Sequence, residues 1–282
     1  MVEKGSFRDK TVVVTGAASG IGREIALAFA RRGARLAVAD INAGGLEKVR
    51  LELTPLAGKV YAQVVDVAIA AEVEGFCDSV YREMGRVDIL CNNAGIGIGG
   101  RFEDVTLEDW EWTLGVNLWG VIHGCHYFYP RMIAQGGGGH IVNTASGAGL
   151  APLPLMTAYC CTKYAVVGFS ETLRAEAALH GIGVSAICPG IVNTPITGSA
   201  RLCSGTERST SQQLQEKIIS IYARRNYTPD RVAAAVVKAV ERNRGVVPVC
   251  PETYLGDWLH RASRRLNDAG LARSVRLFLR RL

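Results

Sequence analysis

The chain has 282 residues, of which 48% are hydrophobic and 21% are charged, and this composition fits one large α/β domain with a sizeable core. Its apolar runs all fall short of the ~18 residues that a membrane-spanning helix needs, so we expect no such helix. The first ten residues, MVEKGSFRDK, are charged and lack an apolar signal-peptide core, so we expect no signal peptide and a cytoplasmic protein.

Eight cysteines are scattered along the chain without the spacing of a metal site or of a secreted disulfide scaffold. Several of them, including Cys91, Cys125 and Cys188, lie in apolar segments. We therefore expect reduced thiols in the core of a cytoplasmic protein, and no metal. For Cys160 and Cys161, packing within a helix is favoured over the alternative of a thiol-modification site.

Strand and helix patterns alternate along the chain, which predicts a parallel sheet covered by helices on both faces. The fold class is therefore α/β, as a single doubly wound domain. The strands are expected at residues 11–15, 35–39, 60–65, 87–91, from 140, 184–188 and 246–250. The helices are expected at residues 23–33, 70–84, from 106, 157–180, 212–224 and from 228.

A glycine-rich turn follows the first predicted strand and precedes the first predicted helix. Glycines in that place permit a tight turn and a close approach of the backbone to a pyrophosphate at the helix N-terminus. The spacing is G-x-x-x-G-x-G, which differs from the G-x-G-x-x-G of the general dinucleotide fingerprint. The residues expected against a cofactor in this turn are Gly16, Ser19, Gly20, Ile21 and Gly22.

The second predicted strand ends at Asp40, downstream of the glycine turn. An acidic residue there accepts hydrogen bonds from the adenosine ribose hydroxyls, and its charge repels a 2′-phosphate. The alternative is a solvated aspartate at the end of a strand. Because the glycine turn lies upstream, we favour the first interpretation and expect NAD as the cofactor.

Tyr159 and Lys163 lie four residues apart in a predicted helix, so both side chains emerge from one face. A phenol with a pKa of ~10 is a poor base, and moving that pKa to ~7 requires about 4 kcal/mol. A lysine ammonium at ~4 Å supplies about 1 kcal/mol in water but about 4 kcal/mol at an effective dielectric constant of ~20. The pair therefore predicts acid/base chemistry only inside an enclosed site. An ordinary helix turn with an exposed lysine is the alternative.

Ser146, followed thirteen positions later by Tyr159-x-x-x-Lys163, resembles the catalytic core of the short-chain dehydrogenase/reductase family. The resemblance covers roughly residues 7–251 and includes six motifs in the family's order. They are T-G-x-x-x-G-I-G at 15–22, N-N-A-G at 92–95, V-N-x-x-G at 116–120, Ser146, Y-x-x-x-K at 159–163 and P-G at 189–190. The resemblance implies a seven-stranded sheet in the order 3-2-1-4-5-6-7, with NAD across the carboxyl ends of the strands.

The resemblance also implies a role for each catalytic residue. Tyr159 is expected to be the general acid/base, and Lys163 to lower its pKa and bind the nicotinamide ribose. Ser146 is expected to bind the substrate oxygen, and Asn117 to complete a proton relay. The family's NADP-preferring members carry basic residues where this chain has Ser19 or Ile41. The remaining cofactor contacts are expected at Asp66, Val67, Asn93, Ala94, Gly95, Thr144, Pro189, Gly190, Val192 and Thr194.

These features predict interconversion of a secondary alcohol and a ketone by direct hydride transfer, without a metal. Substrate contacts are expected at Ser146, Tyr159, Leu153, Ile191 and Ile196. Together with Leu150, Leu155 and Met156 they indicate a bulky apolar substrate of the steroid, retinoid, terpene or aryl carbinol type. Residues 195–226 are expected to form the substrate loop, irregular at 197–211. A 3-oxoacyl-thioester reductase and a non-catalytic NAD-binding scaffold are the alternatives.

Residues 1–255 are expected to form the catalytic domain and residues 256–282 a basic amphipathic extension. The extension holds seven arginines against Asp257 and Asp268, a balance of 7 − 2 = +5 out of +6 for the chain. Its apolar stripes are Trp258, Ala262 and Leu266, then Leu271, Val275, Phe278 and Leu282. Packing on the body or on a neighbouring subunit is favoured, and a peripheral membrane contact is the alternative.

Two further expectations concern partners. Because the excess basic charge is confined to the extension and no nucleic-acid motif accompanies it, nucleic acid binding is not expected. By the resemblance, the helices that begin near Thr106 and Thr157 are expected to form a two-fold subunit contact. We therefore expect a homodimer or a homotetramer.

Overall fold

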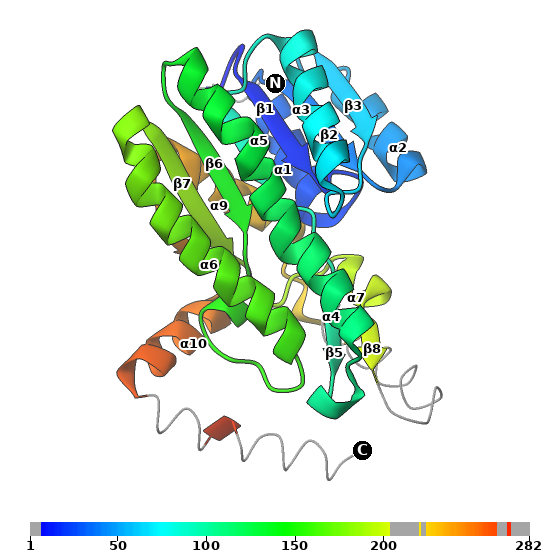
Figure 1. Cartoon of the computed structure of the whole chain (residues 1–282), viewed down its shortest axis with the longest axis vertical. Helices are drawn as coiled ribbons and strands as arrows, with labels where there is room; N and C mark the ends of the chain where they lie inside the picture. Colours follow the sequence, from blue (N-terminus) through cyan, green and yellow to red (C-terminus); the bar gives the residue numbers. More distant parts are fainter. Residues whose placement is uncertain (1–6, 204–219, 221–223, 264–269, 272–282) are drawn as a thin grey trace.

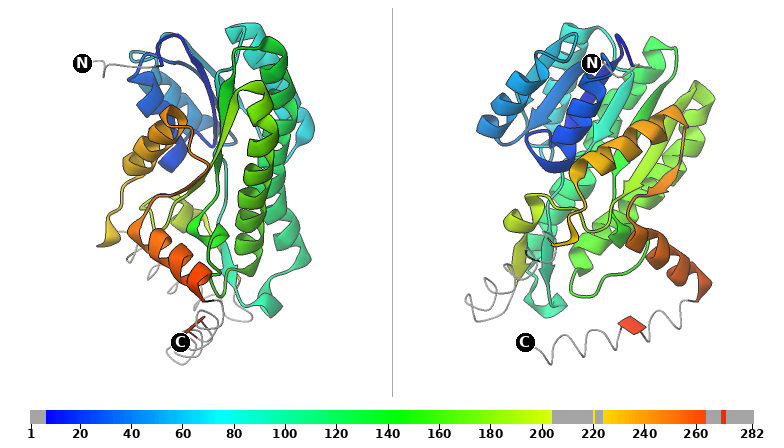
Figure 2. Two further views of the ribbon diagram at one scale, coloured as in Figure 1. Left: turned by 90° about the vertical axis from the view of Figure 1, so that its left-hand side faces the viewer. Right: turned by 180° about the vertical axis from the view of Figure 1, so that it is seen from behind.

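A seven-stranded parallel sheet forms the middle layer of the molecule, with helices on both of its faces (Figures 1 and 2). The computed structural model describes residues 7–203, 220, 224–263 and 270–271, and of Thr197 only the backbone. This three-layer arrangement is the doubly wound α/β fold that the sequence predicts.

The order of the strands within the sheet is β3-β2-β1-β4-β6-β7-β9, and every neighbouring pair is parallel. Numbered among themselves, the seven strands run 3-2-1-4-5-6-7, as expected. The direction of winding reverses between β1 and β4, where the carboxyl ends of an open α/β sheet leave a crevice. The strands are β1 (Thr11–Thr15), β2 (Arg35–Asp40), β3 (Val60–Val64), β4 (Ile89–Asn92), β6 (Gly139–Thr144), β7 (Ile182–Cys188) and β9 (Val246–Pro248).

The helices divide between the two faces of the sheet. One face carries α1 (Gly20–Ala30), α2 (Ala43–Leu53) and α9 (Pro229–Glu241), and α1 packs on α9 (Figure 2). The other face carries α3 (Ala70–Met84), α5 (Gly120–Gln135) and α6 (Thr157–Ala177). The helix α4 (Leu107–Leu114) leads into α5, and a short 3₁₀ turn, Ala178–His180, ends α6.

The apolar runs of the central strands arise because both faces of the sheet are covered. Successive side chains of a strand point to opposite faces, so each face takes alternate residues. In β1, Val12 and Val14 belong to the core with α1, α2 and α9, whereas Val13 belongs to the core with α3, α5 and α6. A strand in this position therefore has no polar face, which is why TVVVT predicts a buried strand.

The segment after β7 differs from the expected irregular loop. Residues Ile196–Ser199 form the short helix α7, and Arg201–Cys203 form the strand β8, which pairs in parallel with β5 (Ile98–Gly100). The Arg201 guanidinium lies 3.9 Å from the Trp112 ring centre and 3.0 Å from an Asp109 carboxylate oxygen. These contacts across the fold give regular structure to a stretch without local periodicity. The expected helix at 212–224 and residues 204–211 lie outside the described residues, apart from residues 220 and 224.

The helix α10 (Pro251–Ala262) crosses the expected domain boundary at residues 255 and 256. Its first turn contacts the body through the buried Thr253, whereas Trp258 is 65% exposed and Ala262 is also exposed. The expected packing of this apolar stripe on the body of the same chain is therefore wrong for these two residues. Most of the remaining extension, including Leu266, lies outside the described residues.

Two further features concern membrane-spanning helices and the state of the cysteines. In the described ranges, no helix combines the length and the apolar character needed to cross a membrane. All eight cysteines lie in those ranges as free thiols, and six of them are buried, as expected for core residues.

Our first prediction concerns His140, a buried residue of β6 whose Nε2 lies 2.7 Å from Ser185 Oγ. Burial, reinforced by the charge of Arg174, lowers the pKa of His140 to about 4. In the unfolded chain the histidine pKa is about 6.5. Between pH values of about 4 and about 6.5 the unfolded chain therefore binds more protons than the folded chain, so the free energy of unfolding falls as the pH falls through this window. From pH 7 to pH 5 the free energy of unfolding falls by about 2 kcal/mol because of His140.

Urea unfolding of the wild type and of His140→Gln at both pH values measures this loss. The glutamine can keep a hydrogen bond to Ser185 but does not titrate, so His140→Gln should lose about 2 kcal/mol less than the wild type. The control variant His126→Gln, at an exposed histidine, should behave as the wild type does. Equal losses of unfolding free energy in all three proteins would show that the titration of His140 does not cause the pH dependence.

Candidate active site

The sequence motifs converge at the carboxyl edge of the sheet, beside the point where the strand order reverses. Four of the six lie at or directly after the carboxyl ends of β1, β4, β6 and β7, which share one edge of the sheet, and the other two lie in helical segments, one in the turn before α5 and one in α6 (Figure 1). Segments more than 100 residues apart in the sequence therefore meet in one place.

The glycine turn packs directly on the backbone that follows β4. Gly16 has a φ of +65°, and a Cβ atom at this position would lie 2.7 Å from Ala94 Cα. A Cβ atom at Gly22 would lie 2.0 Å from the Gly16 carbonyl oxygen. Side chains are thus excluded at both positions, and the N-terminus of α1 stays open to an anion such as a pyrophosphate. The turn fits the expected dinucleotide.

Asn93 holds the ends of three strands together. Its Nδ2 donates to the carbonyl oxygens of Thr15 and Gly16 at 3.2 and 3.3 Å. Its Oδ1 accepts from Thr144 Oγ1 at 3.3 Å. The Thr15 hydroxyl in turn accepts from the backbone N–H groups of Asn93 and Ala94 at 3.0 and 3.2 Å. Thr15 begins the T-G-x-x-x-G-I-G motif, but it was not among the residues expected in the site, and its bonds to the N-N-A-G segment were not predicted.

Asp40 lies at the end of β2, next to the glycine turn. Its carboxylate accepts from the backbone N–H groups of Ala18 at 2.9 Å and Asn42 at 2.8 Å. A carboxylate offers about four acceptor positions, so hydrogen bonds from ribose hydroxyls can be added. The neighbouring Ser19 and Ile41 are exposed and uncharged. The position fits a ribose with free hydroxyls better than a 2′-phosphate.

Asp66 and Val67 shape the turn after β3, where the adenine is expected. The Asp66 carboxylate accepts from the Ala68 N–H at 2.9 Å. The buried Val67 lies against Gly120, at which a Cβ atom would come within 2.7 Å of the valine side chain. The turn is therefore fixed between its own aspartate and the start of α5.

Asn117 lies in a π-helical turn, Gly115–Trp119, between α4 and α5. The sequence predicts one continuous helix here, so this turn is a correction. The fully buried Asn117 side chain bonds both backbone groups of Ile96: its Oδ1 accepts from the N–H at 2.8 Å, and its Nδ2 donates to the carbonyl oxygen at 3.0 Å. A widened turn of this kind often occurs at functional sites. Asn117 thus fixes the segment that follows the N-N-A-G motif.

Lys163 presents a buried ammonium group to the candidate site. The residue is 4% exposed, its Nζ donates to the Thr144 carbonyl oxygen at 3.0 Å, and burial lowers its pKa to about 8. Nζ also lies 5.6 Å from the ring centre of Tyr159, which is half-buried. The structure therefore places the two side chains together in an enclosed setting, as the electrostatic argument requires. An exposed lysine on an ordinary helix turn is ruled out.

Ser146 follows β6 and begins a 3₁₀ turn, Gly147–Gly149. Its hydroxyl oxygen accepts from the Ala148 N–H at 3.2 Å, which leaves its proton available for donation. The turn packs closely on α6, because a Cβ atom at Gly149 would lie 2.5 Å from the Lys163 carbonyl oxygen. The backbone of Ser146 is thereby fixed relative to the helix that carries Tyr159.

The P-G segment after β7 extends from the serine side of the site to the glycine turn. The Gly147 N–H donates to the carbonyl oxygen of the buried Pro189 at 2.7 Å. At the other end, a Cβ atom at Gly20 would lie 3.4 Å from the Thr194 side chain. The segment therefore lies along the path expected for the nicotinamide half of a cofactor.

The apolar residues expected around a substrate divide into two groups. Leu153 is 44% exposed, and Ile191 and Ile196 are half-buried, so their side chains are accessible. Leu150 is buried in the core and is wrong as a wall residue. Leu155 has a φ of 64°, and its carbonyl oxygen accepts from the Gly100 N–H at 2.8 Å, which ties the loop before α6 to β5.

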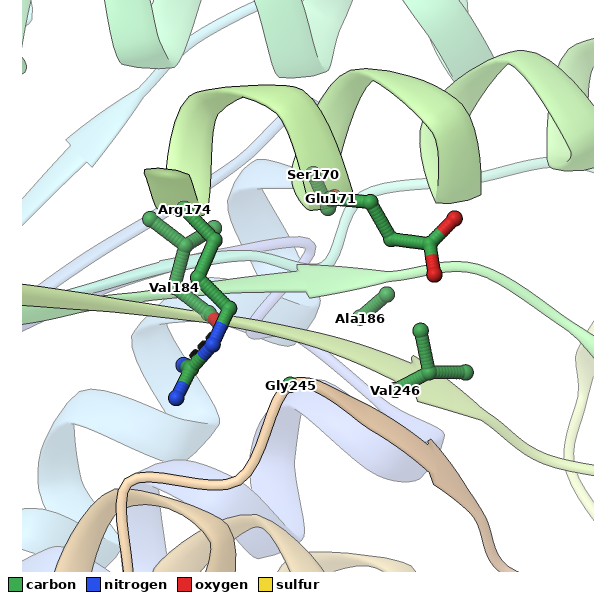
Figure 3. A pocket seen from close by; sticks show the side chains of 7 residues that line it. All are labelled: Ser170, Glu171, Arg174, Val184, Ala186, Gly245 and Val246. Atoms are coloured by element: carbon green, nitrogen blue, oxygen red, sulfur yellow. Dashed lines mark hydrogen bonds between the residues drawn. The ribbon is translucent and has the colours of Figure 1, made fainter. Parts of the chain in front are cut away.

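The small cavity in Figure 3 is separate from this site. It measures about 10 Å³, room for about one water, between α6, β7 and β9. Ser170, the lining residue nearest in sequence to Tyr159, lies three helical turns further along α6. A hollow of about 170 Å³, lined partly by Gly181 and Ile182, lies at the opposite end of β7 from the motifs. Neither accounts for the motif residues. Within the described ranges, no group of three or more His, Cys, Asp or Glu residues gathers as a metal site.

Comparison with known proteins identifies relatives that share this arrangement. The sequence model of the short chain dehydrogenase family matches residues 10–203. The probable oxidoreductase EphD of Mycobacterium tuberculosis is 44% identical over 252 residues, which are 89% of this chain but only 43% of that protein. The D-threitol dehydrogenase of Mycolicibacterium smegmatis is 40% identical over 81% of this chain and 84% of its own length.

A solved structure agrees with the sequence relatives. A short chain dehydrogenase/reductase from Burkholderia phymatum, in complex with NAD, superposes with a TM-score of 0.84. It is 33% identical to this chain, and the match covers 92% of this chain and 95% of the other. With the strand order and the converged motifs, these matches confirm the resemblance seen in the sequence: the chain belongs to the short-chain dehydrogenase/reductase family of oxidoreductases.

Proposed function

We propose that this chain is an NAD-dependent oxidoreductase that interconverts a secondary alcohol and a ketone. One observation carries the proposal: the buried ammonium group of Lys163 lies beside Tyr159 where the glycine turn, the N-N-A-G segment and the P-G segment converge. That combination serves acid/base chemistry on a hydroxyl next to a dinucleotide. A binding scaffold has no need of it, because burying an unpaired charge is costly.

Tyr159 is the proposed general acid/base. When the alcohol is oxidised, its phenolate accepts the hydroxyl proton, and when the ketone is reduced, its phenol returns that proton. A bound nicotinamide supplies the chemistry of hydride exchange with the substrate carbon. Lys163 favours the phenolate electrostatically, and the low effective dielectric of its buried position makes this effect large.

Ser146 and Asn117 have supporting roles in the proposal. The Ser146 hydroxyl can donate to the substrate oxygen while it keeps its bond to the Ala148 N–H. Asn117 is proposed to complete the proton relay from Lys163 to solvent. Its side chain fixes Ile96 beside the lysine, because a Cβ atom at Gly95 would lie 3.2 Å from Asn117 Oδ1 and 3.6 Å from Lys163 Nζ.

The substrate class rests on the side chains around Tyr159. Leu153, Ile191 and Ile196 support a bulky apolar alcohol or ketone. A second candidate, a small polyol, is favoured by the D-threitol dehydrogenase relative. The free, mostly buried cysteines support a reducing compartment such as the cytoplasm.

Tyr159→Phe tests the catalytic proposal, because it removes the transferable proton and keeps the ring. Reduced-nicotinamide absorbance should first identify a substrate among steroid, terpene, aryl and polyol alcohols and 3-oxoacyl thioesters. The variant should lower kcat at least 100-fold with NADH binding within a few-fold of wild type. Tyr164→Phe, one residue beyond the lysine, is the control and should remain active. Wild-type rates in Tyr159→Phe would refute the mechanism, and NAD binding without turnover of any substrate would favour a scaffold.

Asp40→Asn tests the choice of cofactor, since it removes the charge that repels a 2′-phosphate and keeps the side-chain volume. We expect the wild type to prefer NAD, and the ratio of kcat/KM for NAD over NADP to fall at least tenfold in the variant. Asp66→Asn is the control and should affect both cofactors alike. The assignment fails if the wild type prefers NADP or if Asp40→Asn leaves the ratio unchanged.

We further propose a homodimer or homotetramer, for which the exposed apolar residues of α10 supply one surface. Tyr254, Leu255, Trp258 and Leu259 are 46–65% exposed within one helix, and a group of neighbouring exposed apolar side chains is typical of a protein or membrane contact. Light scattering at micromolar concentration should give a multimer, and Trp258→Glu should lower the mean mass or destabilise the multimer. A monomer that sediments with anionic vesicles, and less so at high salt, would instead support the membrane contact.

A further inference from the structure

The first turn of α10 packs on the backbone of two candidate-site segments. A Cβ atom at Gly190 would lie 2.5 Å from Glu252 Oε1 and 2.8 Å from Thr253 Oγ1. A Cβ atom at Gly147 would lie 3.1 Å from the same threonine oxygen. Helix α10 therefore contacts both the P-G segment and the turn after Ser146, with no room for a side chain between them.

The Glu252 carboxylate bonds the P-G segment directly. Its Oε1 accepts from the Ile191 N–H at 3.0 Å, and its Oε2 pairs with the guanidinium of Arg225. Partial burial alone would raise the pKa of Glu252, but bonds from its own N–H and the Ile191 N–H, together with Arg225, hold that pKa below its ordinary value. The acceptor is therefore a carboxylate at neutral pH, and a hydrogen bond to a charged acceptor is about twice as strong as a neutral one.

The neighbouring N–H groups of the segment are held in a similar way. The Gly190 N–H donates to Cys250 Sγ at 3.2 Å, and the Asn193 N–H donates to the Tyr227 carbonyl oxygen at 2.9 Å. Residues after 225 thus bind three of the four N–H groups of residues 190–193. The N–H of Val192 has no acceptor within the described part of the chain, although the residue is 4% exposed. Buried backbone donors are nearly always paired, so this N–H is available to a ligand.

We propose that Glu252 is a positioning residue for the nicotinamide end of the cofactor. Its carboxylate accepts from the Ile191 N–H and so fixes the orientation of that peptide. This in turn orients the next N–H, that of Val192, toward the cofactor. The C-terminal helix α10 thereby completes the cofactor site. The inference rests on the proposed function for the identity of the cofactor, and its own content is that Glu252 acts on the nicotinamide half alone.

The test compares the dissociation constants of NADH and ADP-ribose by calorimetry. ADP-ribose keeps the adenosine, the pyrophosphate and a ribose but lacks the nicotinamide. For Glu252→Ala we expect the Kd for NADH to rise at least tenfold and the Kd for ADP-ribose to change less than twofold. Glu252→Gln, which keeps an acceptor oxygen without the charge, should raise the Kd for NADH about threefold. The control variant Asp257→Asn breaks only the pair with Arg261 on the same helix and should match the wild type.

Three results would overturn the inference. Equal weakening of both ligands would show a general structural role, and an unchanged Kd for NADH would show no role. A wild type that binds neither ligand would overturn the proposed function as well, which separates the two failures. If Glu252→Ala does not fold, Glu252→Gln and Arg225→Met carry the test, and each should weaken NADH selectively by about threefold.

Discussion

The buried ammonium group of Lys163 is the constraint on which the candidate site depends. Its Nζ donates to the Thr144 carbonyl oxygen at 3.0 Å, and burial lowers its pKa to about 8. A charge taken out of water destabilises the fold unless other groups compensate for the lost hydration. In the described residues, that compensation is one carbonyl oxygen and the nearby Tyr159 ring, 5.6 Å from Nζ. A negative phenolate at Tyr159 would relieve this deficit, and this is the physical basis of the acid/base role that we propose for the pair.

The rest of the site keeps this charge enclosed. Asn93 joins the ends of β1, β4 and β6, and Asn117 fixes the chain after β4 through both backbone groups of Ile96. Both amides bond backbone groups, and because hydrogen bonds have preferred distances and angles, they fix the loops in position. Gly16 and Gly149 then permit backbone contacts closer than any side chain allows. The amide hydrogen bonds and the close backbone contacts at glycine together bring loops from separate strands within hydrogen-bonding distance.

Sequence reasoning succeeded where local chemistry decides the structure. The double burial of Val12, Val13 and Val14 follows from an apolar run, and α3 has the predicted bounds, Ala70–Met84, because Gly85 ends it in the left-handed conformation. The π-helical turn around Asn117 and the strand β8 depend instead on contacts with residues far away in the sequence. The motifs identified the candidate residues by resemblance, but not the contacts that hold them in place, such as those of Thr15 with the N-N-A-G segment and of Glu252 with Ile191.

The exposed apolar face of α10 has a physical origin that the sequence pattern hides. The inward face of its first turn meets backbone at Gly147 and Gly190, where even a Cβ atom would lie within 3.1 Å of a Thr253 or Glu252 oxygen. The short hydroxyl of Thr253 and the Glu252 carboxylate, which accepts from the Ile191 N–H, fit this close contact. A tryptophan or leucine in their place would have to displace the P-G segment or the turn after Ser146. The polar residues Glu252 and Thr253 therefore occupy the face of α10 that meets the backbone, whereas the bulky Trp258 lies on an exposed part of the helix.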